Sequence, residues 1–406
     1  MRWLNRLQHS SRRDRGAVAT IVTIICTLGV VVGMLAISAD MGSIMSQRRS
    51  GQNSSDAAAM TLAFACSRRD ATICSSTATT APAITSIASA NSSSATVTDA
   101  CASAVARTVA GGSVPLAECP AGVTADLGSC MPATTTTGLL SYVEVRTRST
   151  ASTPFGGALN AGSTRPVPAC ARAAWGPPGQ YTARVPIVVS ECEWNNNTSN
   201  GTVYQTGPAG AAPGYGTAAG QTPWPALSAE IVTLLKSTGA VPCAINGKDT
   251  AGGFGYVQDP AGNCSIAVNI GDWAQINTGS SPPSGCDTVI AAYQGTVVEL
   301  PIFDCLVKQG TPPTGPITGY SDCTGAGAGG ANSYYHIKGW AKFYLTGYKV
   351  GGSQQAASLR SGSVPCSGGD RCISGWYVSG TLSGAGTPSP PTPGSSFGAN
   401  VVAPAG

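Results

Sequence analysis

The longest apolar segment of the chain runs from Ala17 to Ala39 and contains no charged residue. As a helix that rises about 1.5 Å per residue it would reach ~34 Å, enough to cross the ~30 Å hydrocarbon core of a bilayer. Arginines flank the segment unequally, most of them before it: Arg2, Arg6, Arg12, Arg13 and Arg15, against Arg48 and Arg49. The positive-inside rule then places residues 1–15 in the cytoplasm as a basic tail. We predict a transmembrane helix over 16–39 and a single-pass protein of the cell membrane, with the bulk of the chain extracytoplasmic.

Two features of this span leave alternatives open. Ala36-Ile37-Ser38 before Ala39 is an acceptable small-residue cleavage site, so a removed signal peptide is the alternative to an anchor. Signal h-regions run to roughly 7–15 residues, which is shorter than this span and favours the anchor. Gly29 and Gly33 form a GxxxG pair that would let a second transmembrane helix pack closely, although small residues are common in such helices anyway.

The segment that follows, 40–65, predicts a juxtamembrane helix. Gly51 weakens it, so we expect a break there, before Ser54. Ser54 or Ser55 would cap the second part, with Asp56 in its first turn, where a carboxylate suits the helix dipole. The alternative for Asp56 is a contact with a partner protein.

Beyond the helix the pattern predicts a mainly β region with long loops, and hence the α+β class. Residues 66–137 are rich in Ala, Ser and Thr and predict a small Cys-rich subdomain with a short helix over 83–90. Residues 138–383 predict a β-rich, disulfide-stapled domain, with period-two alternation or turn-bounded strands at 140–147, 181–189, 295–303, 334–348 and 375–382. Residues 226–236 fit a helix or a buried strand. Within 334–348 we expect a strand pair, with Gly339 or Gly347 as bulge or turn. Residues 384–406 predict a disordered Pro/Gly/Ser tail.

Composition agrees with export. Charged residues make up 10% of the chain, against about 25% in ordinary soluble domains. The 52 glycines and 28 prolines predict many turns and few long helices. The net charge of +4 includes the arginines of the basic tail, so no footprint for nucleic acid remains.

Cysteine is the second strong signal. Of the 15 cysteines, Cys26 lies in the apolar span, and the even number that remains predicts up to seven disulfides in an oxidising compartment. A metal site is the weaker alternative, because no C-x-x-C pair occurs and His336 is the only histidine after the span. Spacing leaves the connectivity open, apart from a loop closed by Cys366 and Cys372 that we expect. The disulfide candidates are Cys66, Cys74, Cys101, Cys119, Cys130, Cys170, Cys192, Cys243, Cys264, Cys286, Cys305, Cys323, Cys366 and Cys372.

The residues around the span also follow a known pattern. The chain reads Arg15-Gly16-Ala17, then a span closing on Asp40-Met41-Gly42, then Gln47-Arg48-Arg49, then Gln52-Asn53-Ser54-Ser55-Asp56-Ala57-Ala58-Ala59. In order and spacing this segment resembles the TadE/TadG-like family, whose members are pilus-assembly proteins of the Flp (tight adherence) system. Weaker echoes of the larger TadG-like members follow, among them Pro154-Phe155. The resemblance implies that the motif residues are Gly16, Asp40, Gly42, Arg48, Asn53, Asp56, Ala57 and Ala58.

One departure separates the chain from processed pilins of that system. Those are cut after a glycine and carry a glutamate at the fifth residue beyond it, whereas here Ile21 stands at the fifth position after Gly16. The missing glutamate argues against a polymerising pilin. We predict that prepilin peptidase leaves the chain intact, and recovery of Ala17 as the mature N-terminus would contradict this.

Catalytic chemistry is not visible, and we predict that the protein is not an enzyme, uses no cofactor and takes no small-molecule ligand. Gly325–Gly330 satisfies GxGxxG without a strand-then-helix context. Gly394–Gly398 satisfies GxSxG with no histidine after it. His336 lies on an alternating strand, which favours a structural or surface role.

Two function classes remain. The first is a membrane-anchored, non-enzymatic component of Flp-type pilus assembly or a related secretion apparatus, with the lipid bilayer and membrane proteins or pseudopilins of that machinery as partners. The second is an anchored extracellular adhesin or a protein that binds cell wall or glycans, because Asp272-Trp273 and Cys192-Glu193-Trp194 set a carboxylate beside an aromatic ring. The sequence does not decide between a filament component and an assembly factor, nor between one exported domain and two.

Overall fold

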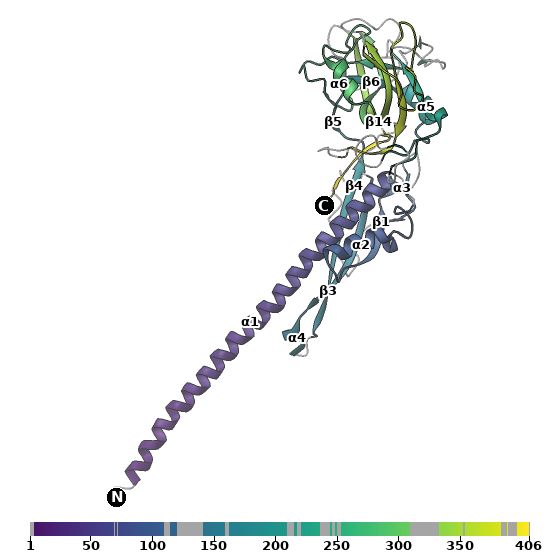
Figure 1. Ribbon diagram of the computed structural model, residues 1–406. Coiled ribbons are helices and arrows are strands. Elements are labelled where there is room, and N and C mark those ends of the chain that lie inside the picture. Colours follow the sequence, from purple (N-terminus) through teal and green to yellow (C-terminus); the bar gives the residue numbers. More distant parts are fainter. Residues whose placement is uncertain are drawn as a thin grey trace.

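The protein begins with one continuous helix, α1 (Leu4–Ser67), whose first half stands free and whose second half packs against a sheet (Figure 1). This is a computed structural model, and it describes residues 4–68, 70, 72–108, 114–119, 141–158, 162–208, 215–216, 221–235, 244–245, 248–249, 253–308, 333–351, 354–382, 388 and 396–405. The helix is therefore longer than the sequence predicts, because it already begins in the basic tail.

The expected break at Gly51 is wrong. A glycine in a helix costs about 1 kcal/mol relative to alanine, but here it allows close packing against the sheet. A Cβ atom at Gly51 would lie 3.3 Å from Ser149 Oγ and 3.5 Å from Ala169 Cβ. Contact with the sheet at this point offsets the weak helix propensity, so α1 continues through the glycine.

The sheet against α1, called the proximal sheet below, has six strands in the order β17-β19-β4-β3-β1-β2. They are β1 (Thr96–Ala102), β2 (Ala117–Glu118), β3 (Ser141–Ser152), β4 (Thr164–Gly176), β17 (Gly380–Thr381) and β19 (Ala399–Pro404). β3 and β4 pair along their whole length as an antiparallel hairpin, from Ser141 opposite Trp175 to Ser152 opposite Thr164. The short helix α4 (Pro154–Ala158) lies at its tip, and the hairpin runs back along α1 toward the N-terminus (Figure 1).

Small side chains make the contact between α1 and the proximal sheet. Ala58, Ala59 and Leu62 of the helix are fully buried. They pack with Val143 and Val145 of β3, which alternate with the residues of the opposite face. Helix α2 (Pro82–Asn91) covers the same core from the side, and its formation confirms the predicted short helix. α1 is thus a free apolar helix at one end and a core element of the folded region at the other.

A second sheet, called the distal sheet below, lies beyond the end of α1 and has nine strands. Its main path is β10 (Phe254–Tyr256), β6 (Ile187–Ser190), β13 (Val297–Lys308), β14 (Ser333–Gly351), β16 (Cys372–Val378) and β7 (Ile231–Leu234). β12 (Trp273–Gln275), β15 (Gln354–Ala356) and β18 (Ser396–Phe397) also pair with β14. Its two faces bury separate clusters, one around Phe343 and Tyr377 and the other around Ile337 and Trp340.

The remaining elements are short. Two two-stranded pairs are formed by β5 (Gln180–Ala183) with β11 (Ile266–Asn269) and by β8 (Ala244–Ile245) with β9 (Lys248–Asp249). The helical segments are η1 (Ala78–Thr80), α3 (Ala104–Thr108), α5 (Glu191–Thr198), η3 (Leu227–Ala229) and α6 (Cys286–Ala292). Among the described residues, disulfides join Cys66–Cys74, Cys101–Cys119, Cys264–Cys286 and Cys366–Cys372. Cys170, Cys192 and Cys305 are disulfide-bonded as well. The α+β class and the disulfide-rich β region agree with the sequence analysis.

Several predicted boundaries change in the structure. The expected strand pair over 334–348 is one strand, β14, and its register shifts next to Gly347 as at a bulge rather than a turn. The segment 181–189 splits into β5 and β6, which belong to different sheets. In 226–236 the strand alternative is realised as β7, after one 3-10 turn.

The chain ends differently from the expected disordered tail. Residues 399–404 form β19, which pairs with β4 inside the proximal sheet. Val401 is buried there, and Asn400 Nδ2 donates to Ser67 O at the end of α1. Composition hid this strand, because the Pro- and Ser-rich stretch before it dominates the window. The proximal sheet also contains β1 beside β3, so it crosses the boundary expected at 137/138.

Candidate functional site

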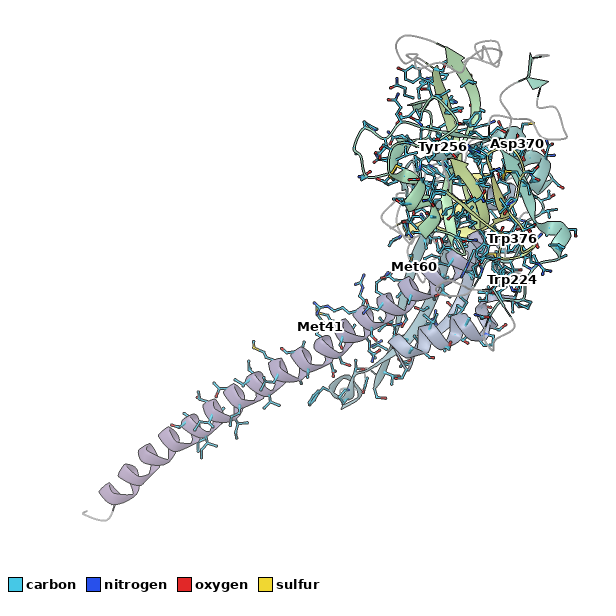
Figure 2. All side chains as sticks on the ribbon, turned by 45° about the horizontal axis from the view of Figure 1, so that its top comes forward. Met41, Met60, Trp224, Tyr256, Asp370 and Trp376 are labelled. Atoms are coloured by element: carbon cyan, nitrogen blue, oxygen red, sulfur yellow. A yellow bond between two sulfur atoms is a disulfide. The ribbon has the colours of Figure 1, made fainter. Side chains whose placement is uncertain are left out.

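The free half of α1 presents apolar side chains to its surroundings on every side. From Val18 onward its large hydrophobic residues are exposed, with Leu35 at 65% and Ile37 at 63% (Figure 2). Cys26, in the same stretch, is the free cysteine of the described residues. The helix is long and apolar enough to span a membrane. An exposed apolar surface of this kind marks a site of contact with a membrane or with another protein.

The GxxxG pair lies in this free half. A Cβ atom at Gly29 or at Gly33 would meet nothing within 4 Å. No described part of the chain therefore packs against these glycines, and their role in helix packing stays a prediction.

Asp40 marks the point where the free half of α1 ends and the folded region begins. Its carboxylate accepts hydrogen bonds from the backbone N–H groups of Phe155, at 3.3 Å, and Gly156, at 2.6 Å. These donors lie in α4 at the tip of the β3–β4 hairpin. A charged acceptor on two backbone N–H groups is a strong arrangement, so Asp40 holds the hairpin tip against α1.

An apolar groove of about 220 Å³ lies between α1 and the hairpin tip at this level. The helix contributes the last residues of the apolar span and the first residues after it. The hairpin contributes residues of α4 and of the chain just before and after α4. The lining residues are Ala36, Ile37, Asp40, Met41, Ile44, Thr153, Phe155, Gly156, Gly162 and Arg165. The groove is open to the outside and lies beside the predicted membrane surface.

The Gln-Asn-Ser-Ser-Asp motif does not cap a helix, contrary to our expectation, because α1 passes through it unbroken. Ser54 Oγ donates to Ala88 O of α2 at 2.9 Å, and Ser55 Oγ lies 2.7 Å from Thr147 Oγ1 of β3. Gln52 Nε2 donates to a backbone carbonyl of β4 at 2.8 Å. The two serines are buried and Gln52 is partly buried, and each finds a partner across an interface. The motif therefore joins α1 to the proximal sheet and to α2.

Other motif residues lie on the outer face of α1. In chain order, Gly42, Arg49, Asn53 and Asp56 are exposed; Arg49 is not itself a motif residue but follows the motif residue Arg48. Their spacing of seven, four and three places them on one side of a helix. Asp56 accepts from Gln52 Nε2 at 2.9 Å within the helix and makes no cap. We call this stripe the outer face of α1; the described residues of the folded region leave it uncovered.

The remaining motif residues divide between surface and core. Arg48 is exposed, Ala57 is half-buried, and Ala58 is fully buried in the proximal core. Gly16 lies in the first part of α1. The motif thus contains packing residues and surface residues in alternation, which the sequence alone does not separate.

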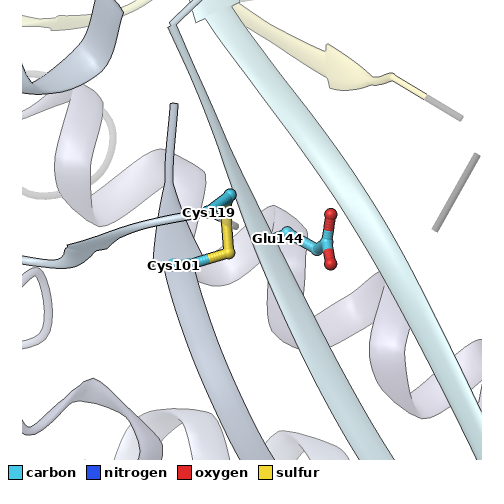
Figure 3. Close-up of side chains that lie close together, drawn as sticks. All are labelled: Cys101, Cys119 and Glu144. Atoms are coloured by element: carbon cyan, nitrogen blue, oxygen red, sulfur yellow. A yellow bond between two sulfur atoms is a disulfide. The ribbon is translucent and has the colours of Figure 1, made fainter. Parts of the chain in front are cut away.

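Two groups of potential metal ligands occur among the described residues. Cys101, Cys119 and Glu144 form the first (Figure 3), and Asp259 with Cys264 and Cys286 forms the second. In both groups the cysteines are bonded to each other. Metal binding needs thiolates, so these sulfurs are structural staples in the oxidised protein.

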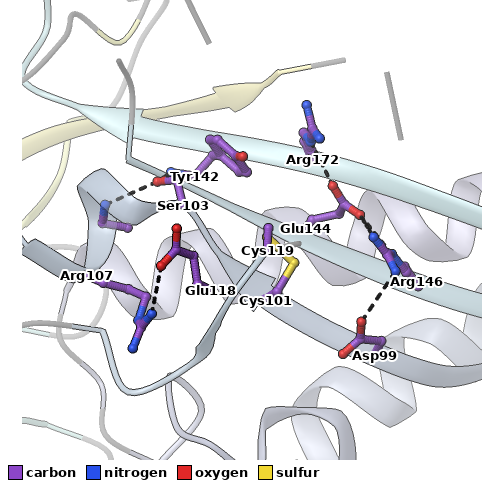
Figure 4. The surroundings of a disulfide bond; sticks show 11 residues. Asp99, Cys101, Ser103, Arg107, Glu118, Cys119, Tyr142, Glu144, Arg146 and Arg172 are labelled. Atoms are coloured by element: carbon purple, nitrogen blue, oxygen red, sulfur yellow. Dashed lines mark hydrogen bonds and ion pairs between the residues drawn. A yellow bond between two sulfur atoms is a disulfide. The ribbon is translucent and has the colours of Figure 1, made fainter. Parts of the chain in front are cut away.

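The outer surface of the proximal sheet carries a buried ion cluster beside the Cys101–Cys119 disulfide (Figure 4). Glu144, whose side chain is 1% exposed, pairs at 2.8 Å with both Arg146 and Arg172. The guanidinium of Arg172 also lies 5.0 Å from the centre of the Tyr142 ring. The cluster links β3 to β4.

His336 sits in a second polar cluster, on the distal sheet. Its Nδ1 lies 2.7 Å from Asp304 Oδ1, and its ring centre lies 5.1 Å from that of Trp273. Nearby, Lys338 Nζ donates to both carboxylate oxygens of Glu191, at 2.7 and 2.8 Å. Burial raises the pKa of Glu191, although the bonds from Lys338 oppose the shift. Both ends of the cluster are paired, which fits the structural role predicted for the histidine.

The two short matches to catalytic motifs lie mostly outside the described residues, although Ser396 of the GxSxG match begins strand β18. Gly325–Gly330 lies outside the described residues, and so do Gly394 and Ser395 of the GxSxG match. Of the two sequence pairs that set a carboxylate beside an aromatic ring, Glu193-Trp194 is buried. Trp194 is 4% exposed and packs on Phe397 with ring centres 4.8 Å apart.

Comparison of the chain with family models, with curated proteins and with solved structures found no match in any of the three. The class of protein therefore rests on its own structure. It has one N-terminal helix long and apolar enough to cross a membrane, joined to a mainly β, disulfide-bonded region.

Proposed function

We propose that the protein is a membrane-anchored, non-enzymatic component of Flp-type pilus assembly or of a related secretion apparatus. Its N-terminus lies in the cytoplasm and its two sheets lie outside the membrane. The excess of arginines before the span supports this orientation, and the disulfides support an oxidising compartment for the sheets. The resemblance of residues 15–59 to TadE/TadG-like proteins supports the choice of apparatus.

The outer face of α1 is the observation that carries the proposal. It begins with Gly42 directly after the apolar span and continues through Arg49, Asn53 and Asp56. Its other side is fully used, because the motif serines and Ala58 pack against the proximal sheet and α2. A small residue followed by charges of both signs allows another protein to approach closely and be oriented by charge. We assign this face to a membrane protein of the assembly machinery.

Deletion of residues 1–65 would not be a clean test of docking through the outer face of α1, because it also removes Leu62 from the core. A charge exchange on the outer face is sharper: Arg49→Glu together with Asp56→Lys reverses both charges and leaves the net charge unchanged. The matched control exchanges the exposed ion pair Arg107–Glu118, whose atoms are 3.1 Å apart, as Arg107→Glu with Glu118→Lys. Both variants are expressed in the native host, and the proteins retained with each are compared with those of the unaltered chain.

The proposal expects secretion or pilus-platform membrane proteins to be retained by the unaltered chain and by the control, and lost with the outer-face variant. Retention by all three would mean that the outer face is not the docking surface. If the unaltered chain retains no such membrane protein, the assignment of the protein to this apparatus is refuted.

An anchored adhesin or glycan-binding protein is the second candidate, supported by Trp273. This ring is partly exposed, next to His336 and Asp304, and exposed aromatic rings are common contacts for sugars. Binding of the full chain in detergent to cell-wall fragments, lost on Trp273→Ala, would favour this function. No binding by the unaltered chain would argue against it.

A further inference from the structure

The hairpin tip, defined as residues 150–158 and 162–164, lies at the level where the apolar span ends. Asp40, the first residue after the span, binds the backbone N–H groups of Phe155 and Gly156. The groove beside it is lined by Thr153 together with Ala36 and Ile37, which belong to the span. Ala36 precedes Asp40 by four residues, or about 6 Å along the helix axis. If α1 crosses a bilayer, the hairpin tip cannot avoid its surface.

Successive contacts along the hairpin show how it reaches that level. Thr147 lies beside Ser55, and Ser149 lies beside Gly51. Gly156 then lies beside Asp40. As β3 advances toward its tip, its contacts move steadily back along α1. The tip is the part of the folded region closest to the free half of the helix (Figure 1).

The composition of the tip suits the boundary between lipid headgroups and acyl chains. No charged residue occurs between Arg148 and Arg165, although the chain turns back there. Phe155, in the short helix α4 at the tip, is 44% exposed, in a position where most loops carry polar groups. A segment without charged side chains that carries an aromatic ring is favourable at such a boundary. Arginines are favourable on the headgroup side of it.

We propose that the hairpin tip is a second membrane contact, with Phe155 inserted among the lipids of the outer leaflet. Asp40 holds the tip at a fixed height on α1, so the two contacts together set the depth and tilt of the helix. The apolar groove between them takes up part of a lipid acyl chain. This inference rests on the proposed membrane anchoring, and it adds to that proposal a specific lipid-binding surface.

A photocrosslinking residue at position 155 tests the proposal. p-Benzoylphenylalanine replaces Phe155 in the full chain, which is reconstituted in vesicles of phosphatidylethanolamine and phosphatidylglycerol and irradiated. Lipid adducts on the tip peptide are measured by mass spectrometry. The same probe at Leu35, in the span, is the positive control. The probe at Leu359, 46% exposed on the distal region, is the negative control.

We expect adducts at position 155 about tenfold above those at position 359, since an interfacial side chain meets lipid continuously. Adducts at position 35 with none above background at position 155 would overturn the inference while leaving the anchor intact. Absence of adducts at position 35 would instead refute the membrane anchoring, and with it the inference about the hairpin tip.

The role of Asp40 has its own test. Asp40→Ala removes the acceptor of the two backbone bonds, and we expect adducts at position 155 to fall several-fold while those at position 35 stay unchanged. Asp40→Asn keeps one acceptor oxygen and so one of the two bonds, and it should restore part of the signal. Unchanged adducts in Asp40→Ala would refute the positioning role.

Discussion

The second half of α1 is a core element of the proximal sheet, and Leu62→Ala tests this packing. Leu62 of α1 is fully buried where the helix packs against the proximal sheet. A leucine-to-alanine change in a core costs 2–5 kcal/mol, depending on how far the site can collapse. Its neighbours on the helix are Ala58 and Ala59, which are too small to fill the space. We therefore expect a loss of about 3–4 kcal/mol.

Hydrogen exchange of the protein in detergent micelles, read peptide by peptide, measures this loss. Because each 1.4 kcal/mol is tenfold in an equilibrium constant, exchange through opening of β3 and β4 should become faster by more than about a hundredfold. Leu35→Ala is the matched control, since Leu35 is 65% exposed in the free half. It should leave β3 and β4 unchanged. Equal effects of the two variants on β3 and β4 would refute the packing of α1 on the sheet.

Three further predictions concern the folded region. Replacing Cys264 and Cys286 by alanine should lower the free energy of unfolding by about 3 kcal/mol, because that bond spans a separation of 22 residues; chemical denaturation measures it. Burial raises the pKa of Glu193 above its ordinary 4.5, so its contribution to stability is complete below pH 4.5 and is lost as the pH rises through the raised pKa. Glu193→Gln should flatten that fall in unfolding experiments as the pH rises above 4.5. A Cβ at Gly375 would lie 1.8 Å from Tyr344 O, so Gly375→Ala should cost about 3 kcal/mol or more, seen in thermal unfolding.

Each of these has a matched control. Alanines at Cys66 and Cys74, separated by eight residues, should cost about 2.5 kcal/mol, and a cost larger than that of the longer loop would contradict the loop argument. Glu193→Asp keeps an ionisable carboxyl group at the position and should retain part of the fall in stability with pH. At Gly369 an added Cβ meets nothing within 4 Å, so a loss equal to that at position 375 would show that the close contact is not the cause.

Much of the architecture could be predicted from local pattern. The apolar span, the short helix α2 and the strands β3 and β13 each follow from a periodicity that a few neighbouring residues express. The Cys366–Cys372 bond was predictable because its loop is short. These features depend on interactions between residues close in sequence.

The candidate site was only partly predictable for the opposite reason. Gln52, Ser54 and Ser55 look like a helix start, yet they bond across interfaces to residues far along the chain. The same holds for Gly51, which sequence reasoning treats as a break and the sheet turns into a point of close contact. Long-range partners cannot be inferred from local propensity, because propensities amount to about 1 kcal/mol or less and packing exceeds them.

The sequence by itself determined that this protein has an apolar helix long enough to cross a membrane and a disulfide-bonded β region after it. Those properties depend on composition, length and residue spacing alone. The tertiary structure decided that the same helix also forms the core of the proximal sheet. It also decided that the last strand returns to that sheet and that Asp40 holds a hairpin tip beside the end of the span. Such features require residues far apart in the sequence to meet, and only the folded chain brings them together.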